Sequence, residues 1–160
     1  MLLPICKTFN LAGLKNAIVI IPDDELRKKF DAFTANISVT GGNTMGYMAA
    51  EAAYRGGEEW LRQVKDIIWN NYLYAAEAFK AALPELKISP LEGTYLMWIN
   101  FGAYLKPDEI KDFFQKTCRI AVDYGEWFGG DAATCVRLNL ATSRENVEEC
   151  VRRIVTALQA

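Results

Sequence analysis

Apolar residues recur at helical spacing through much of the second half of the chain. Between Glu58 and Leu83 they return every three or four positions, which predicts one long amphipathic helix that ends before Pro84. Pro107 and Asp108 open a shorter predicted helix. The apolar positions are Trp60, Val64, Ile67, Ile68, Tyr72, Ala75, Phe79 and Leu83 in the long helix, and Ile110, Phe113 and Phe114 in the shorter one.

A third helix is predicted at the C-terminal end. Thr142 and Glu145 have the spacing of a capping box, in which each side chain bonds to a free backbone group of the first turn. The apolar stripe that follows is spaced for one helix face and consists of Val147, Cys150, Val151, Ile154 and Leu158.

Two segments between these helices have the pattern of strands. Tyr95 to Phe101 is almost wholly apolar, which is typical of a strand covered on both faces. Cys135 to Leu140 alternates, so that Arg137 points away from the face that carries Val136 and Leu138. The order helix, strands, helix, strand, helix predicts helices packed on one small sheet, and we expect residues 59–160 to fold as a unit.

Residues 1–58 have a different organisation. Asn16 to Ile21 is predicted to be a short apolar strand, and Pro22 to Asp24 open a helix with Leu26, Phe30 and Phe33 on one face. After a break at Thr40 to Gly42, a second helix over Met45 to Tyr54 is ended by Gly56 and Gly57. One strand and two helices cannot close a sheet, so we expect residues 1–58 to belong to a larger domain, and the strand edge to pair with another copy of the chain.

Composition and charge narrow the class of protein. The chain has 160 residues, of which 51% are hydrophobic, and this is enough to bury a core. The net charge is -2, with charged residues scattered singly, so there is no basic patch for nucleic acid. The longest apolar run near the start is too short to span a bilayer. We therefore expect a globular cytoplasmic protein without a nucleic-acid or membrane partner.

The absence of histidine limits the chemistry. The four cysteines, Cys6, Cys118, Cys135 and Cys150, lie far apart in the sequence, and no histidine is present. Cys/His zinc sites, Ser-His-Asp and Cys-His nucleophiles and histidine bases are excluded, and no metal site is predicted. The chemistry must use lysine, arginine, tyrosine, cysteine or carboxylates.

Four segments together resemble a known enzyme family. Residues 7–14 (KTFNLAGL) are similar to the segment that holds the Schiff-base lysine in fold-type I pyridoxal 5'-phosphate (PLP) enzymes. The similarity continues, in order, through residues 49–54 (AAEAAY) with 57–61 (GEEWL), 92–98 (EGTYLMW) and 136–141 (VRLNLA). It is closest to the cystathionine β-lyase-like carbon-sulfur lyases, with the class I-II aminotransferases as relatives.

The resemblance implies an α/β fold with two parts. Residues 59–160 would be the small C-terminal α+β domain of the PLP aminotransferase fold, with helices packed on a small sheet. Residues 1–58 would be the C-terminal remnant of the large PLP-binding domain. A homo-oligomer is also expected from the resemblance and from the open strand edge.

The resemblance also assigns roles to two residues. Lys7 would form an imine with PLP, be released by substrate, and remove the substrate Cα proton. Arg137 would bind the substrate α-carboxylate, because a guanidinium grips a carboxylate through two parallel hydrogen bonds. Residues 125–130 (GEWFGG) resemble an aromatic segment near the substrate entrance. The implied reaction of the parent protein is β-elimination from a sulfur amino acid to a thiol, pyruvate and ammonia, and transamination is the alternative.

The sequence departs from the family pattern around the lysine. Pro4, Ile5 and Cys6 stand where relatives often have small hydroxyl residues, and Lys15 stands where many aminotransferases have arginine. The family's aspartate at the pyridine nitrogen, its stacking aromatic and its phosphate-binding turn all precede the lysine. We therefore expect the 160-residue chain alone to be inactive. A non-catalytic regulatory or interaction module is the further alternative.

Overall fold

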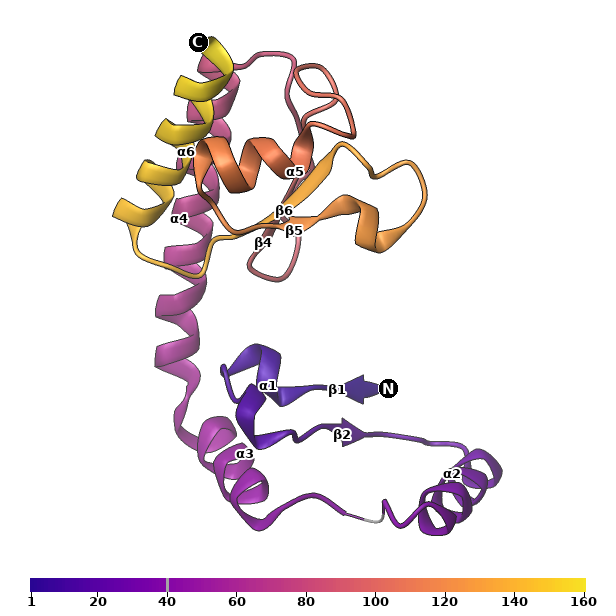
Figure 1. Cartoon of the computed structure of the whole chain (residues 1–160). Helices are drawn as coiled ribbons and strands as arrows, with labels where there is room; N and C mark the ends of the chain where they lie inside the picture. Colours follow the sequence, from indigo (N-terminus) through magenta and orange to yellow (C-terminus); the bar gives the residue numbers. More distant parts are fainter. Residues whose placement is uncertain (40) are drawn as a thin grey trace. The chain divides into compact units, whose positions relative to one another are not determined.

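The computed structural model of this protein describes residues 1–39 and 41–160 (Figure 1). The chain forms two compact units, Met1–Gln63 and Val64–Ala160. The division lies inside helix α4 (Glu58–Ala82), whereas the sequence predicted a boundary after residue 58. Of the predicted break at Thr40 to Gly42, Thr40 lies outside the described residues.

The second unit is built on a four-stranded antiparallel sheet. Its strands are β3 (Lys87–Ile88), β4 (Leu96–Asn100), β5 (Asp123–Tyr124) and β6 (Cys135–Asn139), in the order β3-β4-β6-β5. The helices that pack on it are α4, α5 (Ile110–Asp112) continued by the π-helical turn η2 (Phe113–Cys118), and α6 (Arg144–Gln159). This is the predicted arrangement of helices on one small sheet.

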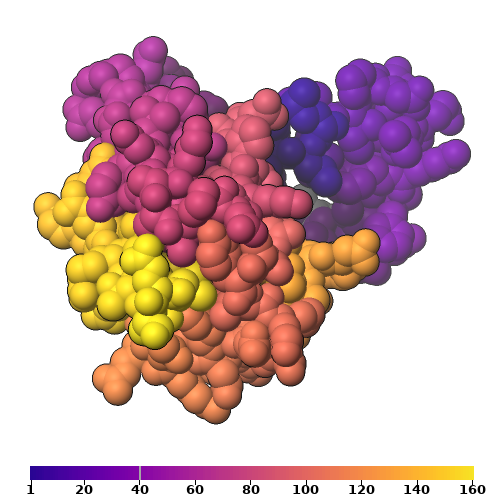
Figure 2. Space-filling model, turned by 90° about the horizontal axis from the view of Figure 1, so that it is seen from above, coloured from indigo at the N-terminus to yellow at the C-terminus, as the bar shows by residue number. Residues whose placement is uncertain are grey.

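Helices α4 and α6 run side by side in the same direction (Figure 1). Near the start of α6, Arg144 Nη2 donates to the Asn70 carbonyl at 2.9 Å, and near its end Gln159 Nε2 donates to the Ala82 carbonyl at 3.2 Å. The space-filling view shows α6, in yellow, at the surface of this unit (Figure 2). The buried Asn71 of α4 also holds the loop between β6 and α6, since its Nδ2 donates to the carbonyls of Leu140 and Thr142 at 3.0 Å each.

One face of the sheet is buried against these helices. Met97 and Ile99 of β4 and Val136 and Leu138 of β6 belong to a single core cluster with residues of α4, η2 and α6. The prediction that Tyr95 to Phe101 is covered on both faces is wrong, because Trp98 and its neighbours on the other face remain partly exposed. Alternation along a strand sends every second side chain to the face that the helices do not cover.

The prediction that Thr142 and Glu145 form a capping box at the start of α6 is also wrong, because the helix begins one residue later than that box requires. Ser143, not Thr142, is the residue that precedes the helix. The Thr142 hydroxyl instead accepts a hydrogen bond from Asn146 Nδ2 at 2.8 Å. The Glu145 carboxylate accepts from its own backbone N–H and from the Ser143 side chain, which lowers the pKa of that carboxyl.

The first unit has few buried residues. Its elements are β1 (Leu2–Leu3), α1 (Ile5–Thr8), η1 (Ala12–Leu14), β2 (Ile18–Val19), α2 (Asp24–Asn36), α3 (Thr44–Gly56) and the first turns of α4. The predicted strand is present but short, and β2 pairs antiparallel with β1. The predicted face of α2 is exposed at Leu26, Phe30 and Phe33. Among the described residues of this unit, burial is confined to Ile5, Gly46 and Ala50.

Two kinds of feature are absent from the residues that the structure describes. No helix in residues 1–39 and 41–160 is both long enough and apolar enough to cross a membrane. Within the same residues, no three histidine, cysteine, aspartate or glutamate side chains lie close enough together to hold a metal ion.

Candidate functional site

The uncovered face of the sheet carries a row of three functional side chains. Arg137 is at the centre of β6, directly opposite Trp98 on β4 and Asp123 on β5. Because directly paired residues of an antiparallel sheet project from the same face, all three side chains lie on the side away from the core. The strand register therefore builds the surroundings of Arg137 from residues that are 14 and 39 positions away in the sequence.

Arg137 already binds a carboxylate. Its Nε and Nη2 donate to the same oxygen, Oδ2 of Asp123, at 2.9 and 2.6 Å. The two side chains are 32% and 40% exposed, so the pair is partly shielded from water but open to a ligand. Nη1 of Arg137 has no hydrogen-bond partner among the described residues. Asp123 thus occupies the Nε and Nη2 edge of the guanidinium, and the Nη1 end remains open.

One aromatic side chain of the turn after β5, Phe128, packs against Arg137. The turn η3 (Gly125–Phe128) places the Phe128 ring 4.8 Å from the Arg137 guanidinium carbon, in cation–π geometry. Phe128 also meets Trp98 edge to face, with ring centroids 5.3 Å apart. Trp98 thus lies on the face away from the core, whereas Tyr95 packs against the core cluster. Trp127 and Phe128 are exposed.

Gly125 makes this turn possible. A Cβ atom on Gly125 would overlap the carbonyl oxygen of Ala132 and lie 2.8 Å from that of Cys135. The two ends of the loop between β5 and β6 therefore meet at a position where no side chain fits. This close approach brings Asp123 and Phe128 to the same arginine.

Lys7 lies in the first unit, on the short helix α1. Ile5 anchors this helix, since it is 2% exposed, and the Lys7 N–H donates to the Pro4 carbonyl at 2.9 Å. The Lys7 side chain is exposed, and within residues 1–39 and 41–160 its amine makes no ion pair or hydrogen bond. Lys7 and Arg137 belong to different compact units, each of which is described by itself.

The segment after Lys7 is held in place by aromatic packing. Phe9 meets Tyr54 edge to face at 5.7 Å and stacks on Trp60 at 6.2 Å. Gly57 lies so close to Phe9 that a Cβ atom there would be 2.7 Å from the ring. Two regions that resemble the family, residues 7–14 and 57–61, are therefore in direct contact.

Asn43 ties the same segment to α3. Its Nδ2 donates to the Leu14 carbonyl at 2.7 Å, while its Oδ1 accepts from the Gly46 N–H at 2.7 Å and caps the helix. One side chain thus starts α3 and fixes the loop that follows Lys7.

Two thiols of the second unit, those of Cys118 and Cys150, are not prepared for nucleophilic chemistry. Burial raises the pKa of Cys118 to about 11 and that of Cys150 to about 12. Both thiols are therefore protonated at neutral pH, and the thiolate is the reactive form. All four cysteines are free.

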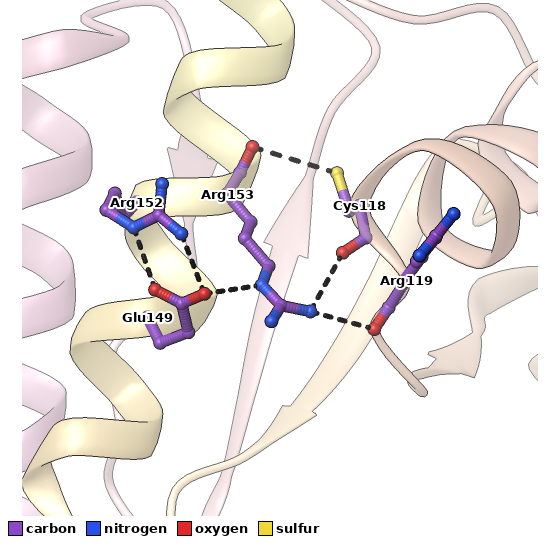
Figure 3. Close-up of polar contacts among 5 residues, drawn as sticks. All are labelled: Cys118, Arg119, Glu149, Arg152 and Arg153. Atoms are coloured by element: carbon purple, nitrogen blue, oxygen red, sulfur yellow. Dashed lines mark hydrogen bonds and ion pairs between the residues drawn. The ribbon is translucent and has the colours of Figure 1, made fainter.

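The surroundings of Cys118 have a structural role (Figure 3). Arg153 of α6 donates through Nε to Glu149 at 2.7 Å and through Nη1 to the carbonyls of Cys118 and Arg119 at 3.4 Å each. The Cys118 thiol lies 4.0 Å from the Arg153 carbonyl. These contacts fasten the end of η2 to α6 and leave the Arg137 face as the candidate site of this unit.

Comparison with solved structures identifies the class of protein. No family model matches the chain. Cystalysin from Treponema denticola, which contains PLP, superposes with a TM-score of 0.93 at 30% identity over 99% of this chain and 40% of its own. A PLP-bound putative aminotransferase from Clostridium difficile gives a TM-score of 0.92 at 32% identity, over 98% and 41% of the two chains. Over nearly its whole length the chain is therefore similar to the C-terminal part of PLP-dependent aminotransferases and C-S lyases.

Curated relatives narrow the resemblance to particular members of that family. The chain is 35% identical to cystathionine β-lyase PatB of Bacillus subtilis over 95% of this chain, and 34% identical to a cystathionine β-lyase of Corynebacterium glutamicum. The chain spans about 40% of the length of these relatives. The family and the fold class predicted from sequence are thereby confirmed.

Proposed function

We propose that this chain is part of a PLP-dependent enzyme that cleaves the C–S bond of a sulfur amino acid by β-elimination, releasing a thiol, pyruvate and ammonia. The similarity to cystathionine β-lyases over 95% of the chain supports this reaction class. The observation that carries the proposal is the grip of Arg137 on a carboxylate through two donors, because the same chemistry would hold the α-carboxylate of an amino acid. The substrate is a small amino acid.

Lys7 is the residue that fits the cofactor. An exposed amine with no ion pair among the described residues is free to react with an aldehyde, and its helix is fixed by the buried Ile5. When bound, PLP would accept the electrons left at the substrate Cα. Lys7 would move the proton at that carbon, and Arg137 would orient the substrate through its carboxylate. The aromatic rings of Phe128 and Trp98 would exclude water beside Arg137.

We propose residues 1–58 as part of the large PLP-binding domain and residues 59–160 as the small domain. The exposed apolar face of α2 supports the first assignment, since such a face requires cover from further protein. The chain spans about 40% of its relatives, so we propose that the 160-residue chain alone is inactive. We also propose that the chain assembles as a homo-oligomer through strand β2, because its exposed edge can pair with another copy. Light scattering should then detect an oligomer.

A cytoplasmic location is proposed from the cysteines. All four are free, and two of them, Cys118 and Cys150, are kept protonated by burial. Free thiols are typical of a reducing compartment.

The cofactor assignment is tested by trapping. The chain is incubated with PLP, reduced with borohydride and mapped by peptide mass spectrometry. We expect the phosphopyridoxyl group at Lys7, its loss in Lys7→Ala, and its retention in the control Lys15→Ala, which removes another exposed lysine from the same segment. Labelling spread evenly over the surface lysines would contradict the assignment and favour a non-catalytic module.

Transamination is the second candidate function, because a putative aminotransferase is 32% identical to this chain. The two reactions are distinguished in the longer parent protein by their products. β-Elimination releases pyruvate from a thioether amino acid without a keto-acid co-substrate, whereas transamination requires one. Turnover that depends on an added keto acid would reject the lyase proposal.

A further inference from the structure

The contact between Arg137 and Asp123 is set by the sheet. The two residues are direct partners in the β5–β6 pair, and their side chains project from the same face. Both hydrogen bonds end on the same aspartate oxygen, at 2.9 and 2.6 Å. A carboxylate therefore occupies the Nε side of the arginine before any ligand arrives.

Phe128 closes a second approach to the guanidinium. Its ring lies 4.8 Å from the guanidinium carbon and covers one face of the group. The ring is itself held edge to face by Trp98, at 5.3 Å. The end of the guanidinium that carries Nη1 and Nη2 remains open. Nη1 has no partner among the described residues, and Nη2 has a second hydrogen that Asp123 does not use.

We propose that Asp123 is a positioning and specificity-determining residue for the carboxylate site at Arg137. It holds the guanidinium from the side, so that a ligand carboxylate binds end-on to Nη1 and Nη2. Its negative charge also weakens the site for every anion and most strongly for ligands with a second carboxylate. The site therefore favours amino acids whose side chain carries no net negative charge, such as a thioether. This inference rests on the proposed role of Arg137.

Asp123→Asn is the informative variant. Asparagine keeps the shape and one acceptor oxygen but removes the charge, so the positioning hydrogen bond can persist while the repulsion is lost. Glu126→Gln is the matched control, since it removes one negative charge from the neighbouring turn at an exposed position. Any general effect of net charge should appear equally in both variants.

The experiment follows the Nε–Hε signal of Arg137 by NMR in the ¹⁵N-labelled 160-residue chain during titration with propionate and with succinate. Arg137→Lys assigns the signal by its disappearance. We expect Asp123→Asn to bind propionate about two- to fivefold more tightly than the unmodified chain, as for loss of an exposed charge interaction, and to gain more for succinate. Glu126→Gln should change neither the affinity for propionate nor the affinity for succinate. Thermal unfolding of each variant confirms that the chain remains folded.

The outcomes separate this inference from the proposed function. A propionate response at Arg137 that is equal in the unmodified chain and in Asp123→Asn would overturn the role of Asp123 and leave Arg137 as the carboxylate site. No response at Arg137 in any variant would overturn both. Equal gains for propionate and succinate would overturn the specificity claim and retain only the positioning role.

Discussion

At the scale of single residues, Gly125 decides whether the Arg137 face can form. The loop between β5 and β6 returns on itself there, and the carbonyl oxygens of Ala132 and Cys135 fill the space that a side chain would need. Asp123 lies two residues before this glycine and Phe128 three residues after it, and both contact Arg137. The chemistry of the arginine thus depends on a residue that does not touch it.

Gly125→Ala is expected to destabilise the second unit. The methyl group would push the loop apart, at a cost of about 1–3 kcal/mol as for an overpacked site, and would move Phe128 away from Arg137. Urea unfolding followed by tryptophan fluorescence measures the free energy of unfolding. Gly93→Ala is the control, because a Cβ atom at Gly93 would meet nothing within 4 Å. Equal stability of the two variants would contradict the packing argument.

At the scale of elements, the junction of α3 and α4 holds the Lys7 segment. Gly57 stands between the two helices, where a Cβ atom would lie 2.5 Å from the Ala53 carbonyl and 2.7 Å from the Phe9 ring. Phe9 in turn contacts Tyr54 of α3 and Trp60 of α4. The position of the lysine segment is therefore coupled to how the two helices join.

Gly57→Ala is expected to release Phe9 from this junction, because the added methyl group occupies the space of the ring. Amide hydrogen exchange should become faster in α1 and in residues 7–14. Gly56→Ala is the matched control, since a Cβ atom at that adjacent glycine would meet nothing within 4 Å. Unchanged exchange in Gly57→Ala would show that the Phe9 contact does not hold the segment.

The packing of η2 against α6 predicts a pH dependence of stability. Burial, and secondarily the neighbouring Cys118, raises the pKa of the Cys150 thiol from its ordinary value of 9.0 to about 12. Below pH 9 the thiol is protonated in both the folded and the unfolded chain. Above pH 9 the unfolded chain releases the proton first, so the free energy of unfolding falls as the pH rises from 9 toward 12.

This pH dependence is measured by urea unfolding at several pH values between 8 and 10.5. Cys150→Ala should decrease less in stability over this range than the unmodified chain, because it lacks one of the three thiols whose pKa is raised by burial. Cys6→Ala, which removes a thiol from the first unit, is the control and should keep the original slope. Parallel curves for all three proteins would count against this linkage.

At the scale of the whole molecule, the two units differ in what they bury. The described core cluster and the partly buried residues around it all lie between Val64 and Leu158. The first unit leaves apolar residues of β2, α2 and α3 exposed. A chain segment that buries little apolar surface cannot offset the conformational entropy that folding removes.

Residues 64–160 are therefore expected to unfold cooperatively as a separate polypeptide, and residues 1–63 are not. Circular dichroism and urea unfolding of the two polypeptides test this. A steep transition for residues 1–63 would show that the first unit is stabilised by contacts other than a core. A broad transition for residues 64–160 would show that the second unit requires the first.

Much of the second unit could be predicted from local patterns. Helices α4 and α6, strands β4 and β6, and the inward residues Ile110, Phe113 and Phe114 follow from apolar periodicity and from proline positions. Two predictions for this unit were wrong, and in both cases the outcome depended on neighbouring groups that the local pattern does not show. Ser143 takes the position before α6 that Thr142 was predicted to take, and one face of β4 stays open because no helix covers it.

The sequence by itself determined the main helices and strands and the family resemblance, and it suggested the proposed roles of Lys7 and Arg137, because periodicity and motifs are properties of short stretches of chain. Only the tertiary structure decided what surrounds Arg137. Asp123 and Trp98 meet it through strand register, and Phe128 meets it through a loop that closes at Gly125. Register depends on which strands pair and in what alignment, and that is fixed by packing of the whole sheet against its helices rather than by any local pattern.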